Sequence, residues 1–191
     1  AIIGGGPTGI AAAYFLGRAG IETTIFEREE KLGGVPRYVI PAFRISDEAL
    51  DKDVALMERL GVEVKCGAPA PSVAELKKMG YTHILLATGA WQAGELGIPG
   101  NVRGVIAWMK EMKQQVKPCL EGHVVVVGAG NTAMDAARVA KRMGAASSTI
   151  VYRRTKKEMP ADDWFKESDV EGGQTSAPYF YWVIEGITSE N

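Results

Sequence analysis

The feature that most constrains the fold is a glycine-rich junction between a strand and a helix in the second half of the chain. Residues 124–127 are four consecutive valines, which predicts a parallel strand buried on both faces. Gly128 and Gly130 then predict a tight turn, and a helix is expected from about Asn131. The unpaired N–H groups at a helix N-terminus carry partial positive charge and bind pyrophosphate. Ala133 at the third fingerprint position is small enough for the helix to pack on the strand.

The strand that follows this helix ends in two arginines. Residues 148–152 are predicted to form the strand, and Arg153 and Arg154 come directly after it. At this position an acid hydrogen-bonds the ribose 2′-hydroxyl of NAD, whereas an Arg accommodates the 2′-phosphate of NADP. The arginine pair, together with Asn131 and Thr132 at the helix start, therefore predicts an NADPH site.

The chain opens with the same arrangement but the opposite charge. Residues 2–3 lead into a glycine-rich turn, a helix is predicted over 10–19, and the next strand, 23–26, ends at Glu27. A ribose-binding carboxylate is expected about 20 residues after such a turn. One GxGxxG is weak evidence, but two, with opposite charges after their second strands, indicate a chain that holds two different dinucleotides. The candidate residues of the first turn are Gly4, Gly6, Pro7, Thr8 and Gly9.

A mixed apolar and basic segment follows Glu27. Gly33 and Gly34 allow the backbone to approach a bound group closely. Two prolines within residues 36–41 favour an ordered loop over a regular element. Arg37 and Arg44 are either phosphate contacts or isolated surface charges.

Between the two fingerprints the sequence predicts further regular elements. Helices are expected over residues 46–60, 73–79 and 105–116, and strands over 62–65 and 81–87. The strand 81–87 is expected to be buried and to end at Thr88 and Gly89. His83 and His123 have no partner motif, so both are predicted to be structural or surface residues rather than catalysts.

Composition and cysteine spacing exclude several classes of function. The 191 residues are 46% hydrophobic and 24% charged with a net charge of −1, which gives no general attraction to nucleic acid or membrane. No apolar run reaches the length of a membrane span, and no signal peptide opens the chain. Cys66 and Cys119 form no CxxC and no Cys/His cluster, so iron–sulfur, zinc and redox-disulfide sites are not supported. Isolated thiols suit a reducing, cytoplasmic location.

An ordered series of motifs runs from residue 1 to about residue 161. It comprises GGGPTG at 4–9, FERE at 26–29, LGG at 32–34, IPAFR at 40–44, ATGA at 87–90, IPG at 98–100, VGAGNTAMD at 127–135, VYRR at 151–154 and EMPA at 158–161. This series resembles the small (beta) subunit of glutamate synthase and its relatives. These relatives include the flavin-binding part of dihydropyrimidine dehydrogenase and the selenate reductase iron–sulfur subunit family.

The resemblance implies an α/β fold with two Rossmann-like units and parallel sheets, in a fragment of a larger flavoprotein that binds two dinucleotides. It also implies roles for particular residues. The first fingerprint, with Glu27 and Arg28, would bind the ADP half of FAD, and the second, with the arginine pair, would bind NADPH. The residues implied to lie along the FAD are Gly33, Gly34, Val35 and Arg44. Thr88 and Gly89 would mark the point where the FAD domain gives way to the NADPH domain.

The expected domains are an FAD-binding half at 1–90, a connector at 91–121, an NADPH-binding half at 122–161 and an unassigned tail at 162–191. The tail contains an aromatic strand candidate, residues 179–184, for which we find no chemistry. The cysteine-rich segment that precedes the first strand in the family has no counterpart here, and neither does its late Gly-Asp flavin segment.

The function implied is NADPH-dependent reduction of FAD. Electrons would then pass to iron–sulfur clusters and an acceptor site in other domains or subunits. The cofactors carry this chemistry, so no acid, base or nucleophile is expected from the chain. Two alternatives remain. One is a thioredoxin-reductase-like disulfide reductase, disfavoured by the missing CxxC, and the other is a non-catalytic nucleotide-binding or interaction module. The final electron acceptor and the oligomeric state are not encoded in any motif.

Overall fold

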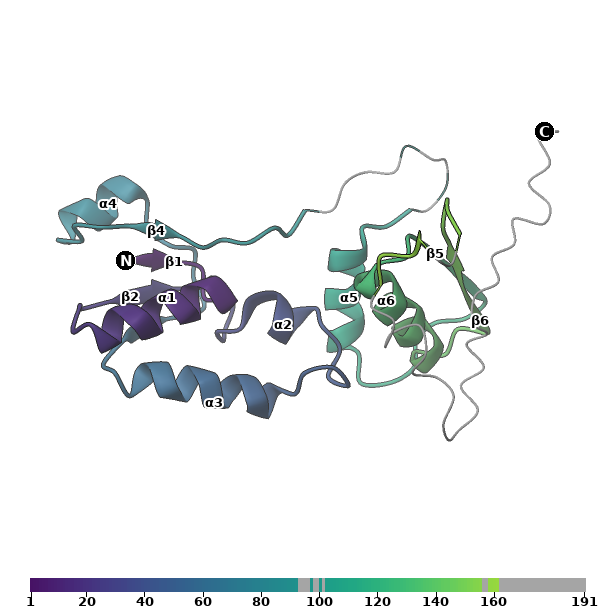
Figure 1. Cartoon of the computed structure of the whole chain (residues 1–191), viewed down its shortest axis with the longest axis horizontal. Helices are drawn as coiled ribbons and strands as arrows, with labels where there is room; N and C mark the ends of the chain where they lie inside the picture. The colour runs from purple at the N-terminus through teal and green to yellow at the C-terminus, as the bar shows by residue number, and fades with distance from the viewer. Residues whose placement is uncertain (93–96, 98–99, 101, 156–157, 162–191) are drawn as a thin grey trace. The chain divides into compact units, whose positions relative to one another are not determined.

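The computed structural model describes residues 1–92, 97, 100, 102–155 and 158–161. The chain divides into two compact units, Ala1–Gly94 and Glu95–Asn191. Each unit contains a parallel sheet with helices packed on it, which confirms the predicted fold class (Figure 1). The predicted tail, with its strand at 179–184, lies outside the described residues.

The first unit holds a four-stranded sheet. Its elements are β1 (Ile2–Ile3), α1 (Pro7–Arg18), β2 (Thr24–Phe26), α2 (Gly34–Tyr38), α3 (Asp47–Glu58), β3 (Glu63–Lys65), α4 (Val73–Lys78) and β4 (Leu85–Leu86). The strand order is β3-β2-β1-β4, with every pair parallel. The order reverses direction at β1, and ligands of such sheets bind at the carboxyl ends of the strands beside this reversal.

The helix after β1 begins at Pro7 rather than at Ile10, so the predicted start was too late. Proline suits the first helical position because no hydrogen-bonded N–H is needed there. Small residues in α1 allow it to pack on the sheet, where Ala13 is fully buried with Ile2 and Ile25. Met57 of α3 completes this core, and α3 also contacts α1.

Helices α3 and α4 begin where the sequence predicts. The Ser46 hydroxyl accepts a hydrogen bond from the Ala49 N–H and caps α3. Ser72 and Glu75 form a reciprocal capping box at α4. Gly61 follows α3 with a φ of 81°, as expected for the residue that ends a helix.

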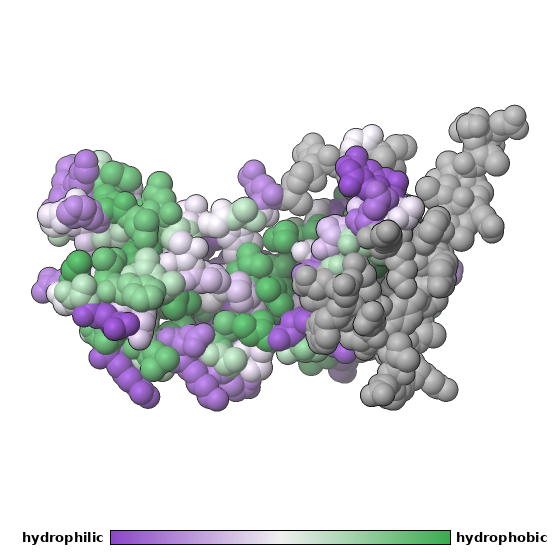
Figure 2. Space-filling view, viewed as in Figure 1, coloured by the Kyte–Doolittle hydropathy of each residue, from purple (hydrophilic) through white to green (hydrophobic). Residues whose placement is uncertain are grey.

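Two predictions in this unit were wrong. The segment after Glu27 was expected to lack regular structure, but it contains the short helix α2, whose Pro36 lies in the first turn, where proline is tolerated. The predicted buried strand 81–87 is reduced to Leu85 and Leu86, and both side chains are exposed, Leu86 at 66%. β4 lies at the edge of the sheet, paired only with β1 among the described strands. Hydrophobic surface is visible over the first unit (Figure 2).

The second unit contains α5 (Val105–Gln114), β5 (His123–Val127), α6 (Asn131–Arg142) and β6 (Ser147–Val151). β5 and β6 are parallel, with Val126 opposite Ile150, and α6 packs on both strands. The core is formed by residues of α6, β6 and the following loop, among them Met134, Ile150 and Met159. α5 contacts α6 and buries Met109.

The expectation that β5 is covered on both faces was wrong. Val126 packs against the core under α6, but Val125 is 60% exposed and Val127 50% exposed on the opposite face. A valine run satisfies either burial pattern, because all of its side chains are apolar and carry no alternation. Among the described helices none is long and apolar enough to cross a membrane.

Candidate functional site

The first glycine turn follows β1 at the reversal point of the sheet, and its glycines meet three different demands. Gly4 has a φ of 107°, and a Cβ there would lie 2.3 Å from the Ala87 carbonyl oxygen. A Cβ at Gly9 would lie 2.0 Å from the Gly4 carbonyl oxygen, so only glycine allows α1 to pack against the turn. Gly6 is different, because the nearest atom to its Cβ position is the Gly34 Cα at 3.8 Å. A side-chain methyl group at Gly6 would therefore make only an ordinary van der Waals contact, so packing within the fold does not require glycine there.

The N-terminus of α1 has its backbone donors uncapped by a side chain. Its N-cap is Gly6, no side chain accepts a hydrogen bond there, and the first turn carries no acidic residue. Pro7 has no N–H, which leaves the amides of Thr8 and Gly9 as donors at the helix start. α3 and α4, in contrast, begin with capping serines. An uncapped N-terminus at the carboxyl end of β1 is suited to bind a phosphate.

Glu27 lies directly after β2 and is buried beside this turn. One carboxylate oxygen accepts a hydrogen bond from the Gly5 N–H at 2.6 Å, and the other accepts one from the Glu29 N–H at 2.9 Å. A carboxylate offers about four lone-pair positions, so two remain for ribose hydroxyls. These two backbone contacts hold the carboxylate beside the turn, and its role as a ribose acceptor stays a prediction. Gly5 itself was missed as a site residue. Its Cβ would lie 2.2 Å from the Leu32 side chain.

The Gly33–Gly34 loop, which runs into the first turn of α2 with Val35, lies against the same turn. The Gly33 N–H donates to the Gly5 carbonyl oxygen at 2.7 Å. A Cβ on Gly34 would lie 2.8 Å from the Gly6 Cα, so the two glycines bring the two backbones together. Both loop glycines have positive φ, 131° and 55°. The predicted flavin loop and the predicted phosphate turn therefore form one continuous backbone surface.

Thr88 and Gly89 follow β4 next to the first turn, since the Thr88 Cα would lie 3.2 Å from a Cβ on Gly4. Beyond them, Trp91 contacts the predicted site residue Arg28, whose guanidinium carbon lies 5.1 Å from the centre of the indole ring. Trp91 was not identified from the sequence, because a single aromatic in a glycine-rich connector carries no pattern.

Arg44 lies in the segment between α2 and α3, with its guanidinium carbon 5.5 Å from the Phe43 ring centre. Its role toward a flavin stays a prediction. Arg37, for which a phosphate contact and an isolated surface charge were both considered, is buried and ion-paired with Asp47 and Asp51 of α3.

The second unit repeats the turn geometry. Gly128 has a φ of 130°, and Gly130 is the N-cap of α6 with no side-chain cap. A Cβ on Gly130 would meet nothing within 4 Å. The amides of Asn131 and Thr132 lie at the helix start, and Ala133 is buried against the turn. The predicted helix start at Asn131 is confirmed.

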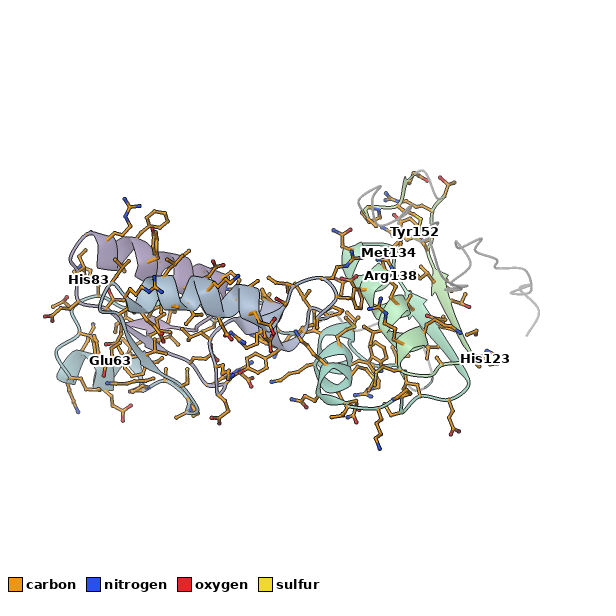
Figure 3. All side chains as sticks on the ribbon, turned by 90° about the horizontal axis from the view of Figure 1, so that it is seen from below. Glu63, His83, His123, Met134, Arg138 and Tyr152 are labelled. Carbon is orange, nitrogen blue, oxygen red and sulfur yellow. The ribbon has the colours of Figure 1, made fainter. Side chains whose placement is uncertain are left out.

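The arginine pair is held on a loop that folds back on this second turn. The Ala161 N–H donates to the Ala129 carbonyl oxygen at 3.0 Å, and the Tyr152 hydroxyl donates to the Glu158 carbonyl oxygen at 3.0 Å. Arg153 and Arg154 follow β6 with exposed side chains. They therefore lie at the carboxyl end of the strand next to β5, where the 2′-substituent of a bound adenosine is expected. Tyr152 and Met134 are labelled in Figure 3.

The histidines and cysteines in the described part of the chain are not assembled into a site. His83 and His123 are exposed and lie at the amino ends of β4 and β5, away from the carboxyl ends (Figure 3). Burial and neighbouring carboxylates, Glu27 first among them, raise the pKa of the Cys66 thiol. Cys119 is exposed in the second unit. Across the described ranges, no group of His, Cys, Asp and Glu is arranged to hold a metal ion.

Comparison with known protein families decides the classification. Residues 1–167 match the profile described as pyridine nucleotide-disulphide oxidoreductase. The chain belongs to this family. Within this family of oxidoreductases, curated relatives confirm the resemblance to the glutamate synthase small chain. Azospirillum brasilense glutamate synthase [NADPH] small chain is 31% identical over 99% of this chain.

Two further relatives are more similar in sequence. YgfK of Escherichia coli, which is named as an oxidoreductase, is 43% identical over 87% of this chain. The NADPH-Fe(3+) oxidoreductase subunit beta of Geobacter sulfurreducens is 37% identical over 96%. The chain spans only 16% of the first, 28% of the second and 42% of the Azospirillum protein.

Solved structures show the same fold. FprA from Mycobacterium tuberculosis in complex with NADPH superposes with a TM-score of 0.69 and 20% identity, over 86% of this chain and 45% of FprA. Lactococcus lactis thioredoxin reductase gives a TM-score of 0.59 and 23% identity, over 87% of this chain and 59% of that protein. At these identities the similarity shows the fold of this oxidoreductase family member and not its substrate.

Proposed function

We propose that this chain is the dinucleotide-binding part of an NADPH-dependent flavin oxidoreductase, with FAD in the first unit and NADPH in the second. Residues 1–90 form the FAD half and residues 122–161 the NADPH half. The NADPH-dependent activities printed in the names of two relatives, the Geobacter and Azospirillum proteins, support this proposal. FAD supplies the chemistry, because it accepts a hydride from a nicotinamide and releases electrons one at a time.

The observation that carries the proposal is that each unit has an open glycine turn, and that the side chains beside the two turns have opposite charges. In the first unit, Gly6 leaves room for a phosphate at an uncapped helix start and Glu27 offers acceptors for ribose hydroxyls. In the second unit, Gly130 leaves the same room, but the residues at the corresponding edge are Arg153 and Arg154. One adenosine lacking a 2′-phosphate and one carrying it fit these two environments.

The protein supplies binding and orientation rather than proton transfer. The backbone amides at the starts of α1 and α6 would neutralise the two pyrophosphates. The two cysteines, half-buried Cys66 and exposed Cys119, and the exposed histidines have no role in this scheme. A disulfide reductase is the second candidate, because thioredoxin reductase shares the fold. The chain has no CxxC to receive the electrons, which favours the flavin reductase.

We propose that the electrons leave toward iron–sulfur clusters and an acceptor site in other domains or subunits. Several relatives are named as beta subunits or small chains of larger enzymes. The net charge of −1 gives this chain no general attraction to nucleic acid, and the two isolated thiols fit the cytoplasm.

Replacing the arginine pair tests the NADPH assignment. In the double variant Arg153→Ala, Arg154→Ala, we expect NADPH affinity to fall by about 2–4 kcal/mol, because hydrogen bonds to charged groups contribute roughly 1.5–3 kcal/mol each. NADH affinity should stay nearly the same, since NADH has no 2′-phosphate. Nucleotide fluorescence titration measures both constants. Arg142→Ala, an arginine in the last turn of α6, controls for lost positive charge. Equal losses for both nucleotides would contradict the assignment.

A further inference from the structure

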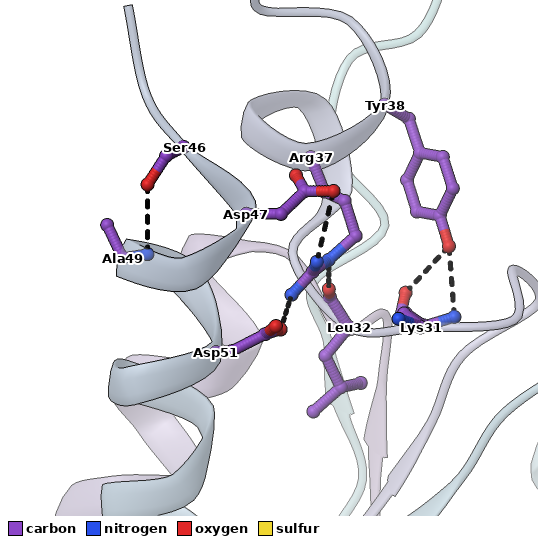
Figure 4. Close-up of polar contacts among 8 residues, drawn as sticks. All are labelled: Lys31, Leu32, Arg37, Tyr38, Ser46, Asp47, Ala49 and Asp51. Atoms are coloured by element: carbon purple, nitrogen blue, oxygen red, sulfur yellow. Dashed lines mark hydrogen bonds and ion pairs between the residues drawn. The ribbon is translucent and has the colours of Figure 1, made fainter. Parts of the chain in front are cut away.

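Arg37 is a buried cation whose contacts join two parts of the first unit. Its side chain is 5% exposed. The Nε donates to the Leu32 carbonyl oxygen, and one terminal nitrogen donates to an Asp51 carboxylate oxygen (Figure 4). The other terminal nitrogen lies 3.7 Å from an Asp47 carboxylate oxygen. The planar guanidinium therefore reaches backbone on one side and two carboxylates of α3 on the other.

On the loop side, Arg37 contacts the segment that lies against the first glycine turn. A Cβ at Gly33 would lie 2.7 Å from the Arg37 Cβ and 3.0 Å from its Nε, so the arginine stem covers this glycine. Leu32, whose carbonyl Arg37 holds, is buried and packs in the core. The next N–H, that of Gly33, donates to the Gly5 carbonyl oxygen at 2.7 Å. The peptide group between Leu32 and Gly33 is thus held by Arg37 at its carbonyl and by Gly5 of the phosphate turn at its N–H.

On the helix side, the anchor is rigid. Asp47 is in the first turn of α3 and Asp51 lies one turn later, so both carboxylates project from the same face. Ser46 caps this helix, and Met57 at its other end is fully buried. Each aspartate side chain is 57% exposed, whereas the Arg37 side chain is 5% exposed. The buried positive charge is therefore neutralised by two carboxylates that lie at the protein surface.

We propose that Arg37 is a positioning residue that fixes the Gly33–Gly34 loop against the phosphate turn by fastening it to α3. The inference rests on the proposed FAD site for its functional consequence, because that loop and turn form the surface the cofactor would contact. In this role Arg37 acts through the loop rather than through a contact of its own with the cofactor. A lysine cannot replace it fully, since one ammonium group lacks the fork that reaches a carbonyl and two carboxylates at once.

Hydrogen exchange on the cofactor-free chain tests the positioning directly. We expect Arg37→Met, which keeps the apolar stem, to accelerate exchange of the Gly33 amide by at least tenfold, an order-of-magnitude estimate for loss of a local anchor. Amides in α1 and β2 should keep their protection. Arg103→Met, which breaks the exposed Arg103–Glu111 ion pair in the second unit, is the matched control and should leave the loop unchanged.

Flavin affinity tests the consequence. We expect the FAD dissociation constant of Arg37→Met to rise roughly 10- to 100-fold, the range found when residues that orient metal ligands are replaced. The FAD dissociation constant of Arg37→Lys should lie between those of Arg37→Met and the wild type. Asp51→Asn should weaken FAD binding less than Arg37→Met does. Far-ultraviolet circular dichroism verifies that each variant is folded.

The two measurements separate the possible failures. Unchanged exchange at Gly33 in folded Arg37→Met overturns the positioning role whatever the flavin result. Exchange that rises equally in α1, β2 and the loop shows a general structural role and also overturns it. If loop exchange is faster in Arg37→Met but the wild type binds no FAD, the positioning role of Arg37 stands and the proposed cofactor is refuted.

Discussion

Adding one methyl group to either open glycine should remove one dinucleotide and leave the fold intact. Gly6 has φ −78° and Gly130 has φ −84°, values that alanine adopts without strain. The nearest atom to a Cβ on Gly6 is 3.8 Å away, and a Cβ on Gly130 meets nothing within 4 Å. Gly6→Ala and Gly130→Ala therefore place a methyl group only where a pyrophosphate would approach.

The expected magnitudes follow from this geometry. Each substitution should change the free energy of unfolding by less than about 1 kcal/mol, because lower unfolded-state entropy offsets the poorer N-cap. A methyl group at the turn pushes a phosphate away by about 1 Å and weakens one or two charge-assisted hydrogen bonds of roughly 1.5–3 kcal/mol each. The loss of about 2–4 kcal/mol corresponds to roughly a 30- to 1,000-fold rise in the dissociation constant.

The two variants control for each other. Gly6→Ala should lose FAD, measured by flavin absorbance after desalting, and should retain NADPH binding, measured by nucleotide fluorescence. Gly130→Ala should show the reverse. Urea unfolding verifies the stability of both. If either folded variant binds its own dinucleotide as tightly as the wild type, the turn does not carry the phosphate and the assignment fails for that unit.

Three further predictions follow from packing and exposure. Gly9→Ala should destabilise the protein by about 3 kcal/mol in urea unfolding, because its Cβ would lie 2.0 Å from the Gly4 carbonyl oxygen and overpacking of this kind costs about 1–3 kcal/mol or more; a change below 1 kcal/mol would contradict this packing. Cys66 should be alkylated by iodoacetamide more slowly than the exposed Cys119 at pH 8, since burial raises the pKa of the Cys66 thiol. Equal alkylation rates, measured by mass spectrometry, would refute the burial. The raised pKa also makes stability depend on pH. The stability contributed by the neutral Cys66 thiol is complete below the unfolded pKa of 9.0 and is lost as the pH rises through the folded pKa. Val125→Thr should change stability by no more than about 0.5 kcal/mol, because the side chain is 60% exposed; a larger loss in thermal unfolding would show that this face is covered.

The local elements were predictable from sequence where short-range chemistry decides them. Ser46 and Ser72 have the side chains that cap a helix, and Gly61 has the freedom that ends one. The two glycine turns were predictable for the same reason, since each requires backbone conformations and space that only small residues allow. Pro7 carried a usable signal too, because proline favours the first helical position.

Burial was harder to predict, because it depends on which other elements arrive. The valines of β5 and the leucines of β4 have the composition of strands covered on both faces, yet Val125 and Leu86 are exposed among the described residues. An apolar run indicates that a strand favours burial, but it does not show whether a helix covers that strand. The chain also spans less than half the length of each of the three curated relatives described above.

The supporting contacts of the candidate site were not predictable from sequence. Arg37 meets Asp51 across 14 residues, and the Gly5 N–H meets Glu27 across 22. The spacing of the fingerprint predicts Glu27 itself but not its hydrogen bond to the Gly5 N–H, and no motif relates Arg37 to Asp51. Both follow only once the strand order brings β1 beside β2 and α3 beside α1. Motifs therefore identify the residues that would touch a cofactor, and the fold identifies those that hold them.

The most direct test of the account is an anaerobic titration of the FAD-reconstituted chain with NADPH and then with NADH, followed by the visible flavin absorbance. The account predicts that flavin retained after desalting is bleached by NADPH at a much lower concentration than by NADH. A chain that retains FAD but is bleached equally by both nucleotides would contradict the NADPH site. A longer protein containing this chain that retains no flavin would contradict the oxidoreductase function itself.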